Sequence, residues 1–179
     1  MSTLEDLYFG QLKDLYDAEH RILDALPKME KEATSPELKQ AIMNHREETE
    51  GQVQRLEQIF ENHGKEPKRE TCKAMKGLIE EGEEELKEWK GEDSVKDAAI
   101  IAAAQRVEHY EISGYGSAKA YAQLLGFTED IGILDETLEE EKKTDLKLTD
   151  IALSGVNQDA IIGETFQSKE SDEQASMRH

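Results

Sequence analysis

Apolar residues recur at three- and four-residue steps along most of the chain, which is the spacing of amphipathic helices. In the first such segment the apolar stripe includes Leu4, Tyr8, Leu12, Leu15 and Ile22. Strict alternation of apolar and polar residues is absent and β-branched residues are sparse, so we expect no sheet. Four long helices are predicted at about residues 3–31, 35–62, 95–125 and 128–153, with a shorter helix or helix pair at 71–89.

Local signals mark where these helices start and stop. Ser2 or Thr3 can cap the first helix, and Pro27 is expected to kink it or to start a new segment. Ser35 followed by a proline restarts the chain, and a glycine at position 126 ends the third long helix. Ser154 and the glycine after it are expected to close the last one.

The lengths of the connections predict the topology. Short loops join antiparallel neighbours, whereas a connection of about 30 residues separates the two predicted hairpins, as in bundles with one long crossover. We therefore predict an all-α fold, a ferritin-like up-down four-helix bundle whose long crossover carries one or two short extra helices. The bundle should span residues 1–155, and the polar tail at 156–179 is expected to be largely disordered or loosely docked.

Acidic residues and one histidine interrupt the apolar stripes of all four long helices near mid-length. A carboxylate that points into a helix bundle loses its water, at a cost of several kcal/mol unless something compensates its charge. Carboxylates that converge from four helices therefore call for a positive partner, and a pair of metal ions is the simplest one. The candidate ligands are Glu19, His45, Glu48, Glu108, Glu111, Glu141 and Asp145.

This set is close to the ligand pattern of dimetal bundles and departs from it in three ways. Those bundles take a Glu from each of two helices and a Glu-x-x-His pair from each of the other two. Here His45 precedes Glu48, so the order is reversed; the fourth helix has no histidine; and the third supplies two glutamates. Hard oxygen and nitrogen donors favour two iron or manganese ions. A one-residue error in the stripe would exchange Glu141 for Glu140.

The alternative for any single glutamate is a solvated helix face, because the chain has 41 acidic residues. The coincidence across four helices is what favours a site. His20 and His109 each follow a stripe glutamate directly, so surface or supporting positions are expected for them. Tyr115 flanks the predicted centre as a packing residue or as a hydrogen-bond donor to a ligand. Nothing marks Cys72 as reactive.

The charge and the motifs exclude several function classes. A formal charge of −19 argues against binding nucleic acid or anionic membranes, both of which need a basic face. With one cysteine no disulfide can form within the chain. The start lacks the features of a signal peptide, and no stretch approaches the roughly 20 apolar residues of a membrane helix. Phosphate-binding loops, hydrolase elbows and zinc spacings are also absent. The expected compartment is the cytoplasm.

Four segments carry a resemblance to a known family. DLYDAEHRILDALPKM, HREETEGQVQRLEQIF, AAQRVEHYEISGYGSAKAYAQLLG and LEEEKKTD resemble the YciF/YciE family of bacterial ferritin-like proteins, over about residues 3–153. The resemblance implies a ferritin-like core with added short helices, a homodimer, a bound dimetal centre and a stress-associated cytoplasmic role. It implies no settled biochemical activity.

The sequence therefore supports three hypotheses of function. The first is a carboxylate-bridged dimetal protein that reacts with peroxide or dioxygen in stress defence, as a catalase-like or peroxidase-like oxidoreductase if it turns over. The second is a stress protein that binds metal for stability or sequestration and has no substrate. The third is a helical interaction module whose acids pair with basic residues of a partner.

Overall fold

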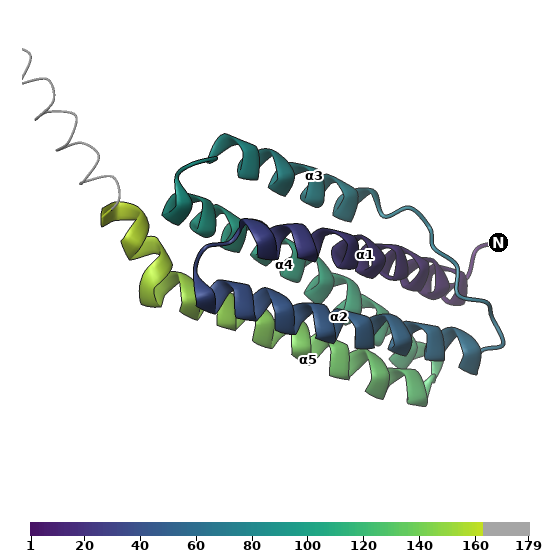
Figure 1. Ribbon diagram of the computed structural model, residues 1–179. Coiled ribbons are helices and arrows are strands. Elements are labelled where there is room, and N and C mark those ends of the chain that lie inside the picture. Colours follow the sequence, from purple (N-terminus) through teal and green to yellow (C-terminus); the bar gives the residue numbers. More distant parts are fainter. Residues whose placement is uncertain (163–179) are drawn as a thin grey trace, which may run out of the picture.

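The computed structural model describes residues 1–162 and is a four-helix bundle with a fifth helix along its outside (Figure 1). The helices are α1 (Leu4–Glu32), α2 (Pro36–Asn62), α3 (Lys73–Glu88), α4 (Asp93–Leu125) and α5 (Thr128–Ile151). No strand occurs in the described part of the chain, which confirms the predicted all-α bundle with a helix in its crossover. None of the helices in residues 1–162 is long and apolar enough to cross a membrane.

The predicted caps form at the two ends of the first hairpin. Thr3 and Asp6 make a reciprocal capping box at the start of α1, and the Ser35 side chain accepts a hydrogen bond from the Leu38 N–H at the start of α2. The α-helix continues through Pro27 to Glu32, so no new segment starts there.

The end of the last long helix differs from the prediction. Ser154 and Gly155 do not close it, because a π-helical turn at Ala152–Val156 follows α5 and the backbone stays helical to residue 162. Val156 is buried in this turn and packs into the core, which keeps the segment on the bundle. Of the predicted tail, residues 163–179 lie outside the described residues.

The bundle places each helix between two antiparallel neighbours. Contacts join α1 to α2 and α4, and join α5 to the same two helices, while α3 lies over α1 and α4 (Figure 1). Helices α1 and α4 approach closely at Gly114, where an added Cβ would lie 2.7 Å from Leu15 Cδ2. A residue with a side chain at this point would push the two helices apart or force Leu15 to move.

Two apolar clusters fill the bundle, one toward each end. In α1 the first cluster extends to Tyr16 and the second begins at Ala18. Along α4, Tyr110 is the last residue that packs against the second cluster. Ile112 packs against the first cluster, and Tyr115 is buried within the first cluster. The intervening layer holds buried polar groups from all four bundle helices, so the predicted interruption of the stripes is a physical layer near mid-bundle.

The crossover is attached to α1 through Asp17, which sequence analysis did not single out. Its buried carboxylate accepts hydrogen bonds from Arg21 Nε (2.5 Å), Arg69 Nε (2.9 Å) and the backbone N–H of Cys72 (2.9 Å). Burial alone would raise the pKa of Asp17, but these hydrogen bonds outweigh burial and hold the pKa below its usual value.

Replacing this carboxylate tests the attachment. Asp17→Asn should lower the free energy of unfolding by about 2–4 kcal/mol, because it removes the negative charge and one of the two acceptor oxygens that the arginines and the Cys72 N–H share. Urea unfolding measures the change. Asp24→Asn, at an exposed position two turns further along α1, is the matched control and should change little; equal effects at the two positions would contradict the assignment.

Candidate metal centre

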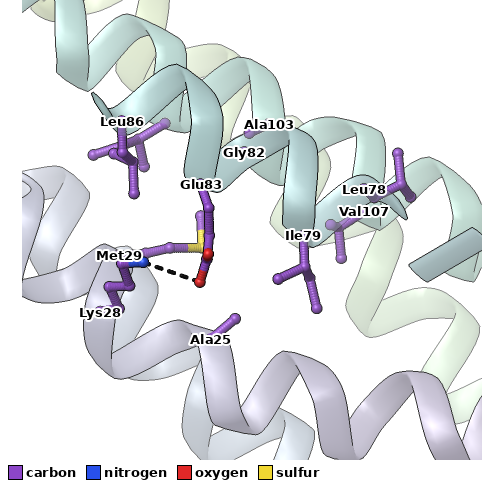
Figure 2. Close-up of a pocket in the computed structure, with 11 residues that line it drawn as sticks. Ala25, Lys28, Met29, Leu78, Ile79, Gly82, Glu83, Leu86, Ala103 and Val107 are labelled. Atoms are coloured by element: carbon purple, nitrogen blue, oxygen red, sulfur yellow. Dashed lines mark ion pairs between the residues drawn. The ribbon is translucent and has the colours of Figure 1, made fainter. Parts of the chain in front are cut away.

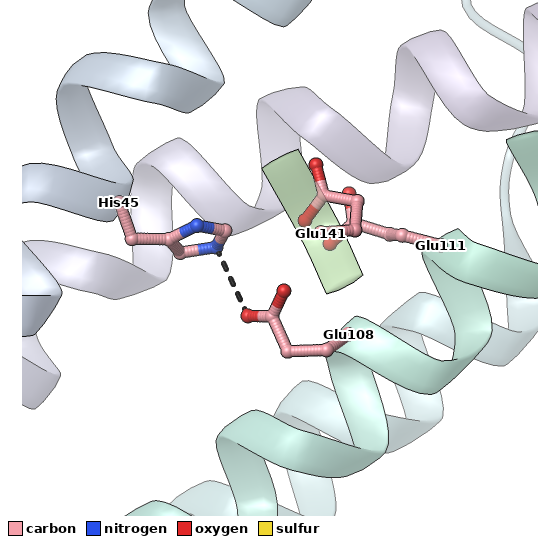
Figure 3. Close-up of side chains that lie close together, drawn as sticks. All are labelled: His45, Glu108, Glu111 and Glu141. Carbon is pink, nitrogen blue, oxygen red and sulfur yellow. Dashed lines mark ion pairs between the residues drawn. The ribbon is translucent and has the colours of Figure 1, made fainter. Parts of the chain in front are cut away.

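Four side chains in the middle polar layer point toward one another (Figure 3). His45 comes from α2, Glu108 and Glu111 from α4, and Glu141 from α5. Each offers one nitrogen or oxygen atom, these atoms all lie within 4.8 Å of one another, and all four residues are buried. The i, i+3 spacing of the two α4 glutamates puts both on the same face of their helix, as predicted.

Glu19 from α1 borders this group. Its side chain is fully buried, and one carboxylate oxygen accepts a hydrogen bond from the Tyr115 hydroxyl. The charges of Glu19, Glu111 and Glu141 affect one another, so the three carboxyl groups share one environment. Of the two roles expected for Tyr115, packing residue or hydrogen-bond donor to a candidate ligand, the structure shows the hydrogen bond to Glu19.

Several buried polar atoms of these five residues lack hydrogen-bond partners. Both oxygens of Glu111, both ring nitrogens of His45, and one oxygen each of Glu19, Glu108 and Glu141 are buried and unpaired. Most buried polar atoms in proteins have a partner, so seven unpaired atoms on five neighbouring residues need an explanation. No lysine or arginine within residues 1–162 forms an ion pair with these glutamates. The arrangement suits a bound cation.

Burial and mutual repulsion raise the pKa values of the four buried carboxyl groups. Burial raises the pKa of Glu19 to about 8, helped by the charge of Glu141 and opposed by the Tyr115 hydrogen bond. Burial likewise raises the pKa of Glu108 to about 8. The pKa values of Glu111 and Glu141 lie well above their usual range because burial is followed by repulsion from neighbouring carboxylates. Without a cation these groups tend to hold protons.

His45 presents a neutral imidazole to the same centre. Burial lowers its pKa to about 4, despite an opposing effect of Glu140. Nε2 lies 3.4 Å from Glu108 Oε1 (dashed line in Figure 3), but the geometry gives neither ring nitrogen a hydrogen bond. The contact is therefore a proximity between a neutral ring and a carboxyl group, and the ring keeps a lone pair available for a metal.

Two residues that sequence analysis did not assign to the centre hold its α5 side. Gln52 Nε2 donates hydrogen bonds to a carboxylate oxygen of Glu141 and to Glu140 Oε2 (3.2 Å). Arg55 donates to both oxygens of Glu140, at 2.8 and 2.5 Å. The structure thus separates the two alternatives of the sequence: Glu141 faces the centre, and Glu140 faces an arginine. The polar stretch of the α2 stripe, which includes Gln52, was the available signal.

The remaining candidate ligands lie at the edge of the group. Glu48 is half-buried and accepts a long hydrogen bond (3.4 Å) from Thr144; burial, followed by the charge of Glu140, raises its pKa. Asp145 accepts a hydrogen bond from Gln105 Nε2 at 3.0 Å and lies 3.3 Å from Nε2 of the exposed His109. Ligation by these two residues stays a prediction.

Another buried acid lies at the end of the bundle far from the centre. Asp130, at the start of α5, accepts a hydrogen bond from the Tyr8 hydroxyl (2.8 Å) and lies 2.7 Å from His63 Nε2. Asp130 is not among the residues predicted from the sequence, because an acid in the first turn of a helix is ordinary. The contacts tie the end of α2 to the start of α5 and to α1.

Comparisons with known proteins place the chain among helical relatives. The profile of a family described as a domain of unknown function, DUF892, matches residues 3–161. Protein YciF of Escherichia coli K12 is 45% identical over 161 residues, which are 89% of this chain and 96% of that protein. The crystal structure of the E. coli stress protein YciF has a TM-score of 0.83 at 46% identity and covers 88% of this chain and 99% of its own.

A second solved structure agrees with the first. YcfI of Rhodopseudomonas palustris, for which a structural role has been suggested, has a TM-score of 0.81 at 44% identity. It covers 83% of this chain and 94% of its own length. The likeness therefore spans nearly the whole bundle in both sequence and structure.

Proposed function

We propose that this chain, which belongs to the DUF892 family of YciF-like stress proteins, binds two iron or manganese ions and reacts with dioxygen or peroxide in cytoplasmic stress defence. The observation that carries the proposal is the set of buried, unpaired carboxylate and imidazole atoms that face one another at mid-bundle. The primary ligands would be Glu19, His45, Glu108, Glu111 and Glu141, with Glu48 and Asp145 as outer ligands.

The donor set fits the proposed ions. Carboxylate oxygens with one neutral imidazole suit iron and manganese better than soft ions that prefer thiolates. Glu111 has both oxygens free and is affected by the charges of Glu19 and Glu141, so it would hold an ion together with those two carboxylates. Two cations would also remove the repulsion that keeps these carboxyl groups protonated.

The residues of this chain would prepare the centre in three ways. The Tyr115 hydroxyl orients Glu19, and Gln52 orients Glu141, so both carboxylates keep a free oxygen toward the centre. The two apolar clusters exclude bulk water above and below it. His45 stays neutral and leaves its lone pair available. When bound, two redox-active ions supply the electron-transfer chemistry that the side chains lack.

A metal-binding protein without turnover is the second candidate. It is favoured by the structural role suggested for the R. palustris relative. The interaction-module hypothesis is less well supported, because Glu19, Glu111 and Glu141 are fully buried and a partner's basic residues would not reach them.

One purification separates these candidates. The protein is purified without chelator and its iron and manganese are counted. One sample is then mixed with hydrogen peroxide, and another is chemically reduced under nitrogen before it is mixed with dissolved dioxygen. About two ions per chain and rapid consumption of either oxidant support the enzyme. Bound metal without consumption supports the second candidate, and metal-free protein that melts at the same temperature with and without added metal contradicts both.

We also propose a homodimer, as the family resemblance implies. Leu146 and Leu153 are 64% and 75% exposed and lie seven residues apart along α5 and the turn that follows it, which favours a shared apolar face. Light scattering that gives twice the 20.3 kDa chain mass would support the dimer.

A further inference from the structure

An apolar pocket lies under α3, where this helix covers α1 and α4 (Figure 2). Its cavity volume is about 40 Å³, and it is partly open to solvent. Leu78, Ile79, Gly82 and Leu86 of α3 form its roof, while Ala25 and Met29 of α1 and Ala103 and Val107 of α4 complete its walls. At its rim, Lys28 Nζ and Glu83 Oε1 form a half-exposed ion pair at 3.0 Å.

A second pocket, with a cavity volume of about 30 Å³, adjoins the first and extends inward. Ala25, Met29, Ile79 and Val107 line both pockets, so the two share a wall. The inner pocket is also lined by His45 and Glu108, whose side chains are 6% and 1% exposed. Together the pockets make an apolar path from the edge of α3 to two residues of the candidate metal centre.

The apolar lining of this path determines which small molecules can enter it. A metal ion in an apolar passage would lose its hydration, and hydrogen peroxide would lose its hydrogen bonds to water. Dioxygen has no such bonds to lose, and apolar gases enter dry apolar cavities in proteins. The path therefore suits a small apolar reactant and disfavours ions and hydrogen-bonding molecules.

We propose that the passage under α3 conducts dioxygen to the His45 and Glu108 side of the centre. The inference rests on the proposed function and narrows its substrate from dioxygen or peroxide to dioxygen. Lys28 and Glu83 are the charged residues that line the outer pocket, and they pair with each other at its rim. Ions must then reach the centre by another route.

Paramagnetic dioxygen allows a test on the metal-free protein. Dissolved dioxygen broadens and shifts nuclear resonances near the sites it occupies, so methyl signals are recorded under nitrogen and under raised oxygen pressure. The methyl groups of Ile79, Val107 and Met29 should show effects several-fold larger than the reference methyl groups of Ile112, Ile131 and Ile133, which are likewise half-buried but pack against the other cluster. Uniform effects would overturn the proposal.

A variant that blocks the passage tests the proposal further, and the same change at an exposed position is its matched control. Ala25→Phe places a ring where the two pockets meet and should reduce the oxygen effect at Val107 to the level of the reference methyl groups. Ala120→Phe, the same change at an exposed position of α4, should leave it unchanged. Ala25→Leu replaces the first variant if the phenylalanine prevents folding. An oxygen effect at Val107 that survives both Ala25 variants would overturn the passage.

Metal content of the unaltered protein is measured in parallel. Bound metal with no selective oxygen effect overturns the passage alone. Failure to bind iron or manganese overturns the proposed function, and with it the delivery of dioxygen to a metal centre, even where the oxygen effect is present.

Discussion

Glu111→Gln is expected to lower the affinity for iron(II) or manganese(II) by about 100-fold or more, since even residues that only orient metal ligands cost 10–100-fold when changed. The same change should leave the metal-free protein as stable as before or more stable. Glutamine keeps the shape of the side chain and removes a carboxyl group that burial and the neighbouring acids disfavour as an anion. Affinity and metal-free stability should therefore move in opposite directions.

Calorimetric titration with each ion and thermal melting with and without metal measure the two effects. Glu47→Gln makes the same change on the exposed side of α2 and should alter neither quantity beyond the scatter of surface substitutions. A Glu111→Gln protein that keeps its metal affinity would remove Glu111 from the ligand set. One that loses both affinity and metal-free stability would indicate a structural role for the carboxyl group.

The stability of the metal-free protein should fall as the pH rises from 6.5 to about 8. The carboxyl groups of Glu19 and Glu108 have ordinary pKa values of 4.5 and folded values of about 8, so over this range the folded protein holds protons that the unfolded chain has lost. Their contribution is fully present below pH 4.5 and is lost as the pH passes about 8. Each extra proton changes the free energy of unfolding by about 1.4 kcal/mol per pH unit.

The titration of His45 does not change the direction of the stability change between pH 6.5 and about 8. Its pKa is lowered from 6.5 to about 4, so the unfolded chain gains a proton on this residue only as the pH falls below 6.5. Between those two values it destabilises the folded protein as the pH falls, which opposes the carboxyl groups. Above 6.5 the carboxyl groups act without this opposition, and the direction of the change is theirs.

Excess metal should reverse the sign. Ions displace the carboxyl protons, so metal affinity rises with pH, and the stability that bound metal confers rises with it. Urea unfolding across the same pH range, in chelator and in manganese, measures both slopes. Equal slopes in the two series would argue against a metal at these carboxylates, and a metal-free protein that gains stability with pH would argue against their protonation.

The helices could be predicted from the sequence because residues that start and end helices stand at most of their boundaries. Thr3 and Ser35 cap the helices they were expected to cap, and Gly126 adopts a left-handed conformation (φ 75°) at the end of α4. The helical continuation after α5 was not predicted, because Val156 is a single apolar residue after a glycine. Its packing against the core is a tertiary contact that the periodicity of the sequence does not encode.

The candidate centre was predictable to the level of a helix face. The i, i+3 pair Glu108 and Glu111 follows from spacing alone, whereas the difference between Glu140 and Glu141 depends on Arg55 of another helix. Such partners lie about 85 residues apart in the sequence, so only the packed bundle brings them together. The contact of Asp17 with the crossover escaped for the same reason.

The polar layer between the two apolar clusters also bears on how the helices find their alignment. A helix that slid by one turn, about 5.4 Å, would carry its glutamate out of this layer and into hydrocarbon. In α1 such a slip would bring Glu19 level with the present positions of Leu15 or Ile22, both deeply buried. Misaligned bundles are therefore destabilised more strongly than they would be with a uniformly apolar interior. The buried acids of the candidate metal centre thus also favour one alignment of the helices over the others.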